Sequence, residues 1–229
     1  ECFGYYEGES GVSGDYFDYK RLDNQWFVAI KCDASGHGIP AAIIMTVVAT
    51  IFRRYFSNWS YQKNGINFNK LVEQINDFNL CIKELEKFLP YMDNWSTCDS
   101  CRPKILKKNS HLLKPIIEKW INTKDADGNY VEFTVRFGVN MLMSYFLDKD
   151  FDKSIFEMVS SIKSDKYYIN MMIAWFFSTA LAKQWKCTYE FLQEENKLSL
   201  WIRKKIIQKA KESYRISDDN KLLLGDLLK

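Results

Sequence analysis

Two residues of this chain have side chains suited to stabilising a positive charge. Trp95 and Asp99 are four residues apart, a spacing that places two side chains on one face of a helix. The π face of an indole attracts positive charge, and a carboxylate stabilises a positive centre as it develops. Arg136 and Trp175, which belong to later segments, could complete this face. Each residue alone has an ordinary explanation, as a core tryptophan, a solvated aspartate or a surface ion pair.

A second group, near the N-terminus, could hold metal ions. Asp15 and Asp33 supply carboxylate oxygens, the ligands that Mg²⁺ and Mn²⁺ prefer. Gly36 and Gly38 follow Asp33 and would let the backbone turn tightly beside it. Two metal ions held in this way can activate water for hydrolysis of a phosphate ester.

The elements that would position these groups change in character along the chain. Residues 11–31 show aromatic and β-branched runs interrupted by turns, which predict strands, and an apolar helix is expected over about 41–56. From about residue 69 onward, apolar residues recur at helical spacing. Short connections between these helices favour a HEAT-like solenoid preceded by a small α+β fragment. Helices are expected over about 69–88, either continuous or interrupted near Phe78, and over about 95–108, 110–122, 131–147, 151–163, 165–184, 187–195, 199–214 and 217–228. Breaks are expected at 125–129, 148–150, 163–165 and 217–219.

The composition is that of a globular protein with a mildly basic C-terminal part. Hydrophobic residues make up 47% of the 229 and charged residues 27%. Residues 1–77 carry seven Lys and Arg against nine Asp and Glu, whereas residues 78–229 carry 25 against 20. A basic surface suits binding to a phosphate backbone, although a solvated lysine-rich helix surface explains it equally well. Six scattered cysteines, with no apolar run or leader pattern, predict a cytoplasmic protein that does not enter membranes.

The N-terminal segment resembles the SpoIIE-like branch of the PPM-type serine/threonine phosphatases. The similarity covers about residues 3–77 and rests on Gly14-Asp15-Tyr16-Phe17-Asp18 and on Asp33-Ala34-Ser35-Gly36-His37-Gly38-Ile39-Pro40-Ala41-Ala42. It implies that Asp15, Asp33 and the carbonyl of Ala34 bind Mn²⁺ or Mg²⁺. The family also needs a later T-D-G strand and a D-D turn. Asp127-Gly128 is the nearest match to the T-D-G strand but lies between predicted helices, so the segment is expected to be truncated and inactive.

The rest of the chain, from about residue 79, resembles the AlkD-like DNA alkylation repair family. The similar segments occur in order and lie at 88–99, 135–139, 167–175 and 206–215. The resemblance implies a HEAT-like glycosylase that hydrolyses the N-glycosidic bond of N3- and N7-alkylated purines without base flipping. It also implies that Trp95, Asp99, Arg136 and Trp175 are the catalytic residues and that no cofactor is needed. The segment Trp201-Ile202-Arg203-Lys204 departs from the family, which has a more polar T-H-N-K-type sequence there.

The sequence therefore predicts two parts, a phosphatase-like segment at 1–77 and a HEAT-like DNA alkylation repair domain at 78–229. The favoured function is that of an alkylpurine DNA glycosylase whose partner is double-stranded DNA with alkylated bases. One alternative is a PPM-type phosphatase that acts on a phosphoprotein. Another is a helical scaffold without catalysis, in which Trp95 and Trp175 would be buried in the core.

Overall fold

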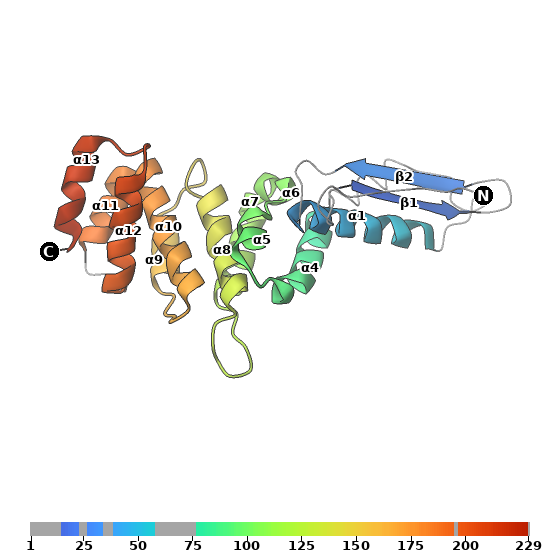
Figure 1. Ribbon diagram of the computed structural model, residues 1–229, viewed down its shortest axis with the longest axis horizontal. Coiled ribbons are helices and arrows are strands. Elements are labelled where there is room, and N and C mark those ends of the chain that lie inside the picture. The colour runs from blue at the N-terminus through green and yellow to red at the C-terminus, as the bar shows by residue number, and fades with distance from the viewer. Residues whose placement is uncertain (1–14, 23–26, 34–38, 58–76, 195–196, 229) are drawn as a thin grey trace. The chain divides into compact units, whose positions relative to one another are not determined.

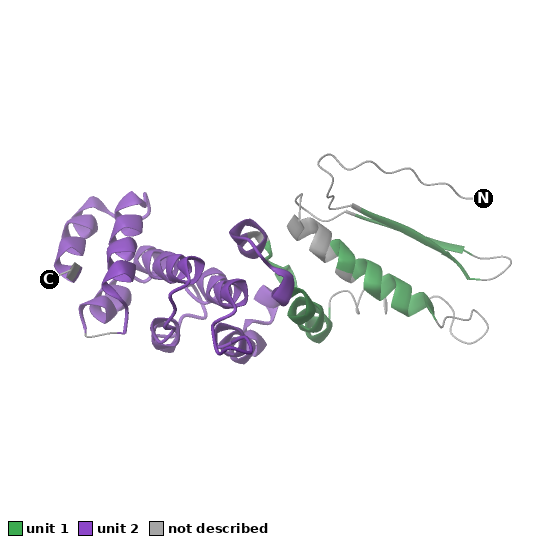
Figure 2. Cartoon of the chain, turned by 60° about the horizontal axis from the view of Figure 1, so that its bottom comes forward, with its two compact units in different colours: residues 1–88, 100–105 green, residues 89–99, 106–229 purple. Residues whose placement is uncertain are grey.

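The computed structural model describes residues 15–22, 27–33, 39–57, 77–194 and 197–228. The chain divides into two compact units, one formed by residues 1–88 and 100–105 and the other by residues 89–99 and 106–229 (Figure 2). The described residues are mainly helical, with a two-stranded sheet near the N-terminus. The predicted fold class is therefore confirmed.

The first unit contains an antiparallel hairpin and helices. Strand β1 (Asp15–Arg21) pairs with β2 (Phe27–Asp33) in a register that sets Asp15 opposite Asp33 and Arg21 opposite Phe27. Helix α1 (Ile39–Ser57) packs on the hairpin and agrees with the helix expected over 41–56. Helix α4 (Phe78–Phe88) begins after Asp77, whose side chain accepts a hydrogen bond from the backbone N–H of Leu80 at 2.7 Å.

Apolar contacts and one ion pair hold the hairpin and α1 together. Val28 of β2 forms a buried cluster with Ile51, Phe52 and Phe56 of α1. Arg53 pairs with Asp18 of β1 at 2.8 Å. Burial alone would raise the pKa of Asp18, but hydrogen bonds from Tyr16, Arg53 and the backbone of Tyr19 lower it below its usual value.

From Leu89 onward the described chain is a succession of short helices (Figure 1). Most lie where helical spacing predicted them, and the breaks predicted at 125–129, 148–150 and 163–165 are confirmed. The break predicted at 217–219 was wrong, because Asp218 and Asp219 begin a helix after the cap residue Ser217. After the short helix η1 (Leu89–Tyr91), the helices are α5 (Trp95–Ser100), α6 (Lys104–Lys108), α7 (Ser110–Ile121), α8 (Glu132–Tyr145), α9 (Ser154–Ser160), α10 (Tyr167–Lys183), α11 (Trp185–Gln193), α12 (Leu200–Glu212), α13 (Asp218–Leu223) and η2 (Leu224–Leu228).

One predicted helix was wrong. The helix expected over 95–108 is two helices, α5 and α6, separated by Cys101, Arg102 and Pro103. A proline disfavours helical geometry at the residue before it and cannot donate a backbone hydrogen bond within a helix. The chain therefore leaves the helix before Pro103 and starts a new one at Lys104.

Helices α8, α10 and α12 lie side by side and run in the same direction. The carboxylate of Glu132, the first residue of α8, accepts a hydrogen bond from the backbone N–H of Tyr168, near the start of α10. At the other end, Lys183 of α10 pairs with Asp148, which lies just after α8, at 2.7 Å. The ring of Tyr167, the first residue of α10, contacts Trp201 at the start of α12. The three helices therefore begin at one edge of the second unit.

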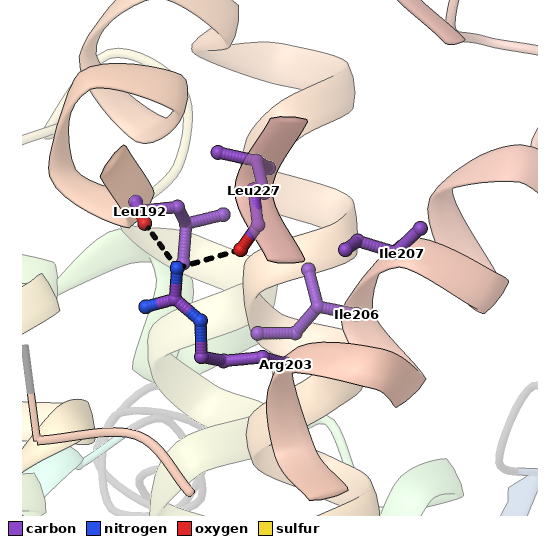
Figure 3. Close-up of a pocket in the computed structure, with 5 residues that line it drawn as sticks. All are labelled: Leu192, Arg203, Ile206, Ile207 and Leu227. Carbon is purple, nitrogen blue, oxygen red and sulfur yellow. Dashed lines mark hydrogen bonds between the residues drawn. The ribbon is translucent and has the colours of Figure 1, made fainter. Parts of the chain in front are cut away.

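Arg203 of α12 forms hydrogen bonds that link the last helices of the second unit. Its guanidinium donates hydrogen bonds to the backbone carbonyls of Leu192 and Leu227, at 2.8 and 2.7 Å (Figure 3). Ile206 and Ile207 complete the small hollow in which it lies. Arg203 thus joins the end of α11 to η2.

Gly138 of α8 allows α7 and α8 to approach each other closely. A Cβ atom at this position would lie 2.6 Å from Cγ2 of Ile121, a buried side chain of α7. We expect Gly138→Ala to lower the free energy of unfolding by about 1–3 kcal/mol, because the core around Ile121 must shift to admit the methyl group. Urea unfolding followed by circular dichroism measures this. Gly225→Ala, where the new Cβ meets nothing within 4 Å, is the matched control and should change stability little.

No helix in the described segments is both long and apolar enough to span a bilayer.

Candidate functional site

Helix α5 is short and carries two of the predicted site residues. Asn94 caps its N-terminus, because the side-chain carbonyl of Asn94 accepts a hydrogen bond from the backbone N–H of Thr97 at 2.9 Å. Trp95 is the first residue of the helix and is 52% exposed. Asp99 follows one turn later, as its spacing predicted.

The buried side chain of Arg136 forms an ion pair with the partly buried Asp99. Nε of Arg136 donates to Oδ1 of Asp99 at 2.9 Å, and Nη2 donates to Oδ2 at 2.6 Å. The side chains are 14% and 4% exposed, respectively. Such a two-point pair fixes the plane of the carboxylate and uses one lone pair of each oxygen, so each oxygen keeps a second one. The pair therefore orients Asp99 and leaves each of its oxygens able to accept a further hydrogen bond.

Aromatic rings surround the guanidinium of Arg136. Its central carbon lies 5.7 Å from the ring centroid of Trp175 and 5.9 Å from that of Tyr168, both on α10. Nη1 also donates to the backbone carbonyl of Tyr168 at 2.8 Å. The structure thus brings Asp99, Arg136 and Trp175 together through direct contacts, and Trp95 lies on the same short helix as Asp99.

Sequence reasoning missed Glu132 and Asn140, two residues that hold this arrangement. Glu132 and Arg136 bind the backbone N–H and C=O of Tyr168, respectively, and so fix the start of α10 against α8. The fully buried amide of Asn140 donates long hydrogen bonds, both 3.4 Å, to the carbonyls of Cys98 and Asp99 at the end of α5. Glu132, Arg136 and Asn140 are spaced four residues apart on α8. That polar row in an otherwise apolar helix was the available signal.

The predicted metal ligands have a partial structural account. The backbone register places Asp15 and Asp33 directly opposite each other at the end of the hairpin. Their side chains, and the Gly-rich turn at 34–38, lie outside the described residues. Among the residues whose side chains are described, no group of three or more His, Cys, Asp or Glu could hold a metal ion. Asp127-Gly128 lies in a turn between α7 and α8, as expected.

The exposure of the tryptophans bears on the scaffold alternative. That alternative places Trp95 and Trp175 in the core, but half of the Trp95 surface is open and Trp175 is only partly buried. In contrast, Trp120 is fully buried against Phe137, with ring centroids 5.3 Å apart. The second unit therefore has a core tryptophan of the usual kind, and Trp95 is not one.

Comparison with known proteins agrees with the C-terminal resemblance. The profile of a family described as DNA alkylation repair enzyme matches residues 51–209, most of the chain. This match begins before residue 79, from which the sequence motifs were recognised. A search of curated proteins found no significant match. Nothing in these comparisons supports a phosphatase-like segment. The family has a HEAT-like helical fold, in agreement with the helices described here. The chain therefore belongs to the DNA alkylation repair enzyme family.

Proposed function

We propose that this chain is an alkylpurine DNA glycosylase that releases N3- and N7-alkylated purines from double-stranded DNA. The reaction is hydrolysis of the N-glycosidic bond. The bond between C1′ and the purine nitrogen breaks, its electron pair leaves with the base, and water adds to C1′ and loses a proton. Alkylation makes the base cationic, so it leaves as a neutral molecule.

The partly buried, oriented carboxylate of Asp99 supports this proposal most strongly. As the bond breaks, positive charge moves from the base to the deoxyribose, and a carboxylate held in place beforehand stabilises that charge without having to reorganise. The pairing with Arg136 holds Asp99 in one orientation. Arg136 is therefore a positioning residue, which acts on the substrate through Asp99.

The two tryptophans suit the cationic state of the lesion. The exposed indole of Trp95 is available to a cation from solvent, and attraction between a cation and an indole face contributes about 0.5–2 kcal/mol. The ring centroid of Trp175 lies 5.7 Å from the guanidinium carbon of Arg136, beside Asp99. From the family resemblance we also propose that the base is not flipped into a pocket, in contrast to most glycosylases.

The test is release of free base from methylated DNA. Purified chain is incubated with duplex DNA that carries 3-methyladenine and 7-methylguanine, and the free bases are quantified by chromatography. A sample without protein corrects for spontaneous depurination. We expect release above this blank without added metal and unchanged by a chelator. Folded protein that binds the DNA but releases no base above the blank would contradict the proposal.

A further inference from the structure

A second group of exposed rings lies beside the Asp99–Arg136 pair and is not explained by the proposed chemistry. Tyr167 at the start of α10 and Trp201 at the start of α12 are 58% and 40% exposed. Their ring centroids are 6.1 Å apart and the rings are nearly perpendicular, at 68°. Exposed apolar side chains that lie next to one another can mark a binding surface. Trp201 also lies in the segment that departs from the family sequence.

A positive charge accompanies these rings. Nζ of Lys205, one turn after Trp201 on α12, lies 5.8 Å from the indole centroid. This amine also donates to Gln208 at 2.9 Å, and an ammonium has three donors, so it can bind a further acceptor. Helix α12 as a whole is rich in basic residues, with Arg203, Lys204, Lys205, Lys209 and Lys211 against Glu212. We call Tyr167, Trp201 and Lys205 the aromatic platform.

The aromatic platform is continuous with the candidate site. The ring of Tyr167 lies 5.3 Å from that of Tyr168, and Tyr168 in turn contacts Arg136. A DNA strand whose lesion is near Asp99 would therefore have its neighbouring nucleotides near the platform. Flat rings beside a cation match the two parts of a nucleotide, because a base stacks on the ring and a phosphate binds the amine.

We propose that the aromatic platform binds an unpaired nucleobase of the DNA that the candidate site engages, with Lys205 on the adjacent phosphate. The proposal rests on the proposed DNA-repair function for the identity of the partner. Bases inside a continuous duplex are stacked on their neighbours and have no free face. The platform therefore gives this chain a preference for DNA with an unpaired nucleotide near the lesion.

The test uses unmodified DNA, so that it does not depend on catalysis. One fluorescent duplex has a three-nucleotide single-stranded gap, and a second has the same sequence without the gap. Affinity for each is measured by anisotropy at one fixed salt concentration. We expect the unaltered chain to bind the gapped duplex more tightly. Trp201→Ala should weaken binding to the gapped duplex about tenfold and leave binding to the continuous duplex nearly unchanged. Trp201→Phe, which keeps a ring, should retain most of the preference.

Two matched variants separate stacking from charge. Lys204→Ala removes the same charge from α12 as Lys205→Ala, but only Lys205 lies against the Trp201 ring. We expect Lys205→Ala to reduce the preference for the gapped duplex. Lys204→Ala should weaken binding to both duplexes equally. If Trp201→Ala reduced the affinity for both duplexes equally, the proposal would be overturned. A change in oligomeric state with unchanged DNA affinity would also overturn it, because the face would then bind a second copy. A missing preference in a chain that still releases alkylpurine contradicts only the platform, not the glycosylase.

Discussion

Replacement of Asp99 by asparagine should reduce the rate of alkylpurine release by about 10²–10³-fold. The amide has nearly the shape of the carboxylate but no charge, so it cannot offset the positive charge that develops on the deoxyribose. Loss of one preorganised electrostatic group in an active site has an effect of this size. Release of 7-methylguanine under single-turnover conditions, with protein in excess over DNA, measures the chemical step.

The control for this variant is Asp152→Asn. Asp152 also pairs with a cation, Lys114 at 2.6 Å, but its side chain is 55% exposed. The Asp152→Asn variant should release alkylpurine at the rate of the unaltered chain. Circular dichroism shows whether Asp99→Asn is folded at the assay temperature, since the change also weakens the pair with Arg136. A folded Asp99→Asn protein with more than about a tenth of the original rate would mean that another group stabilises the charge.

Replacement of Arg136 by methionine should lower the free energy of unfolding by about 3–5 kcal/mol. Methionine preserves much of the length of the side chain but leaves the carboxylate of Asp99 buried without its partner, and such a charge is costly. The carbonyl of Tyr168 also loses the hydrogen bond from Nη1. Urea unfolding followed by tryptophan fluorescence reports mainly on the second unit, which contains Trp95, Trp120, Trp175, Trp185 and Trp201.

Two further variants identify the cause of this loss. Lys114→Met breaks the exposed pair with Asp152 and should cost no more than about 1 kcal/mol. The double variant Asp99→Asn with Arg136→Met leaves no uncompensated charge, so it should be more stable than Arg136→Met alone. Equal costs for Arg136→Met and Lys114→Met would show that burial of the Asp99–Arg136 pair does not matter to stability.

Much of the fold follows from local patterns in the sequence, but the site contacts do not. Helical spacing located most helices of the second unit, and the family resemblance identified Asp99 and Arg136 as parts of one site. Neither showed that the two pair directly, because that depends on how close α5 and α8 come. The contact between Tyr167 and Trp201 likewise joins residues far apart in the sequence. Pro103 was visible in the sequence and should have predicted the break between α5 and α6.

The amide of Asn140 and the carboxylate of Glu132, both on α8, illustrate the same limit. Asn140 looks like an unremarkable polar residue in a helix until the end of α5 is placed beside it. Its role depends on tertiary packing, which periodicity does not encode. The same holds for Glu132. Its partner is the backbone N–H of Tyr168, and every residue except proline has such a group, so the side-chain types in the sequence do not reveal the contact.

The shared direction of α8, α10 and α12 has an electrostatic consequence. The peptide dipoles of each helix add up to about half an elementary positive charge at its N-terminus. Because these three helices begin at one edge, their partial charges accumulate there, offset in part by the carboxylate of Glu132. This field comes from the backbone, so it does not titrate and survives the removal of any lysine. The edge that carries Tyr167 and Trp201 should thus keep some attraction for phosphate even in a chain without its α12 lysines.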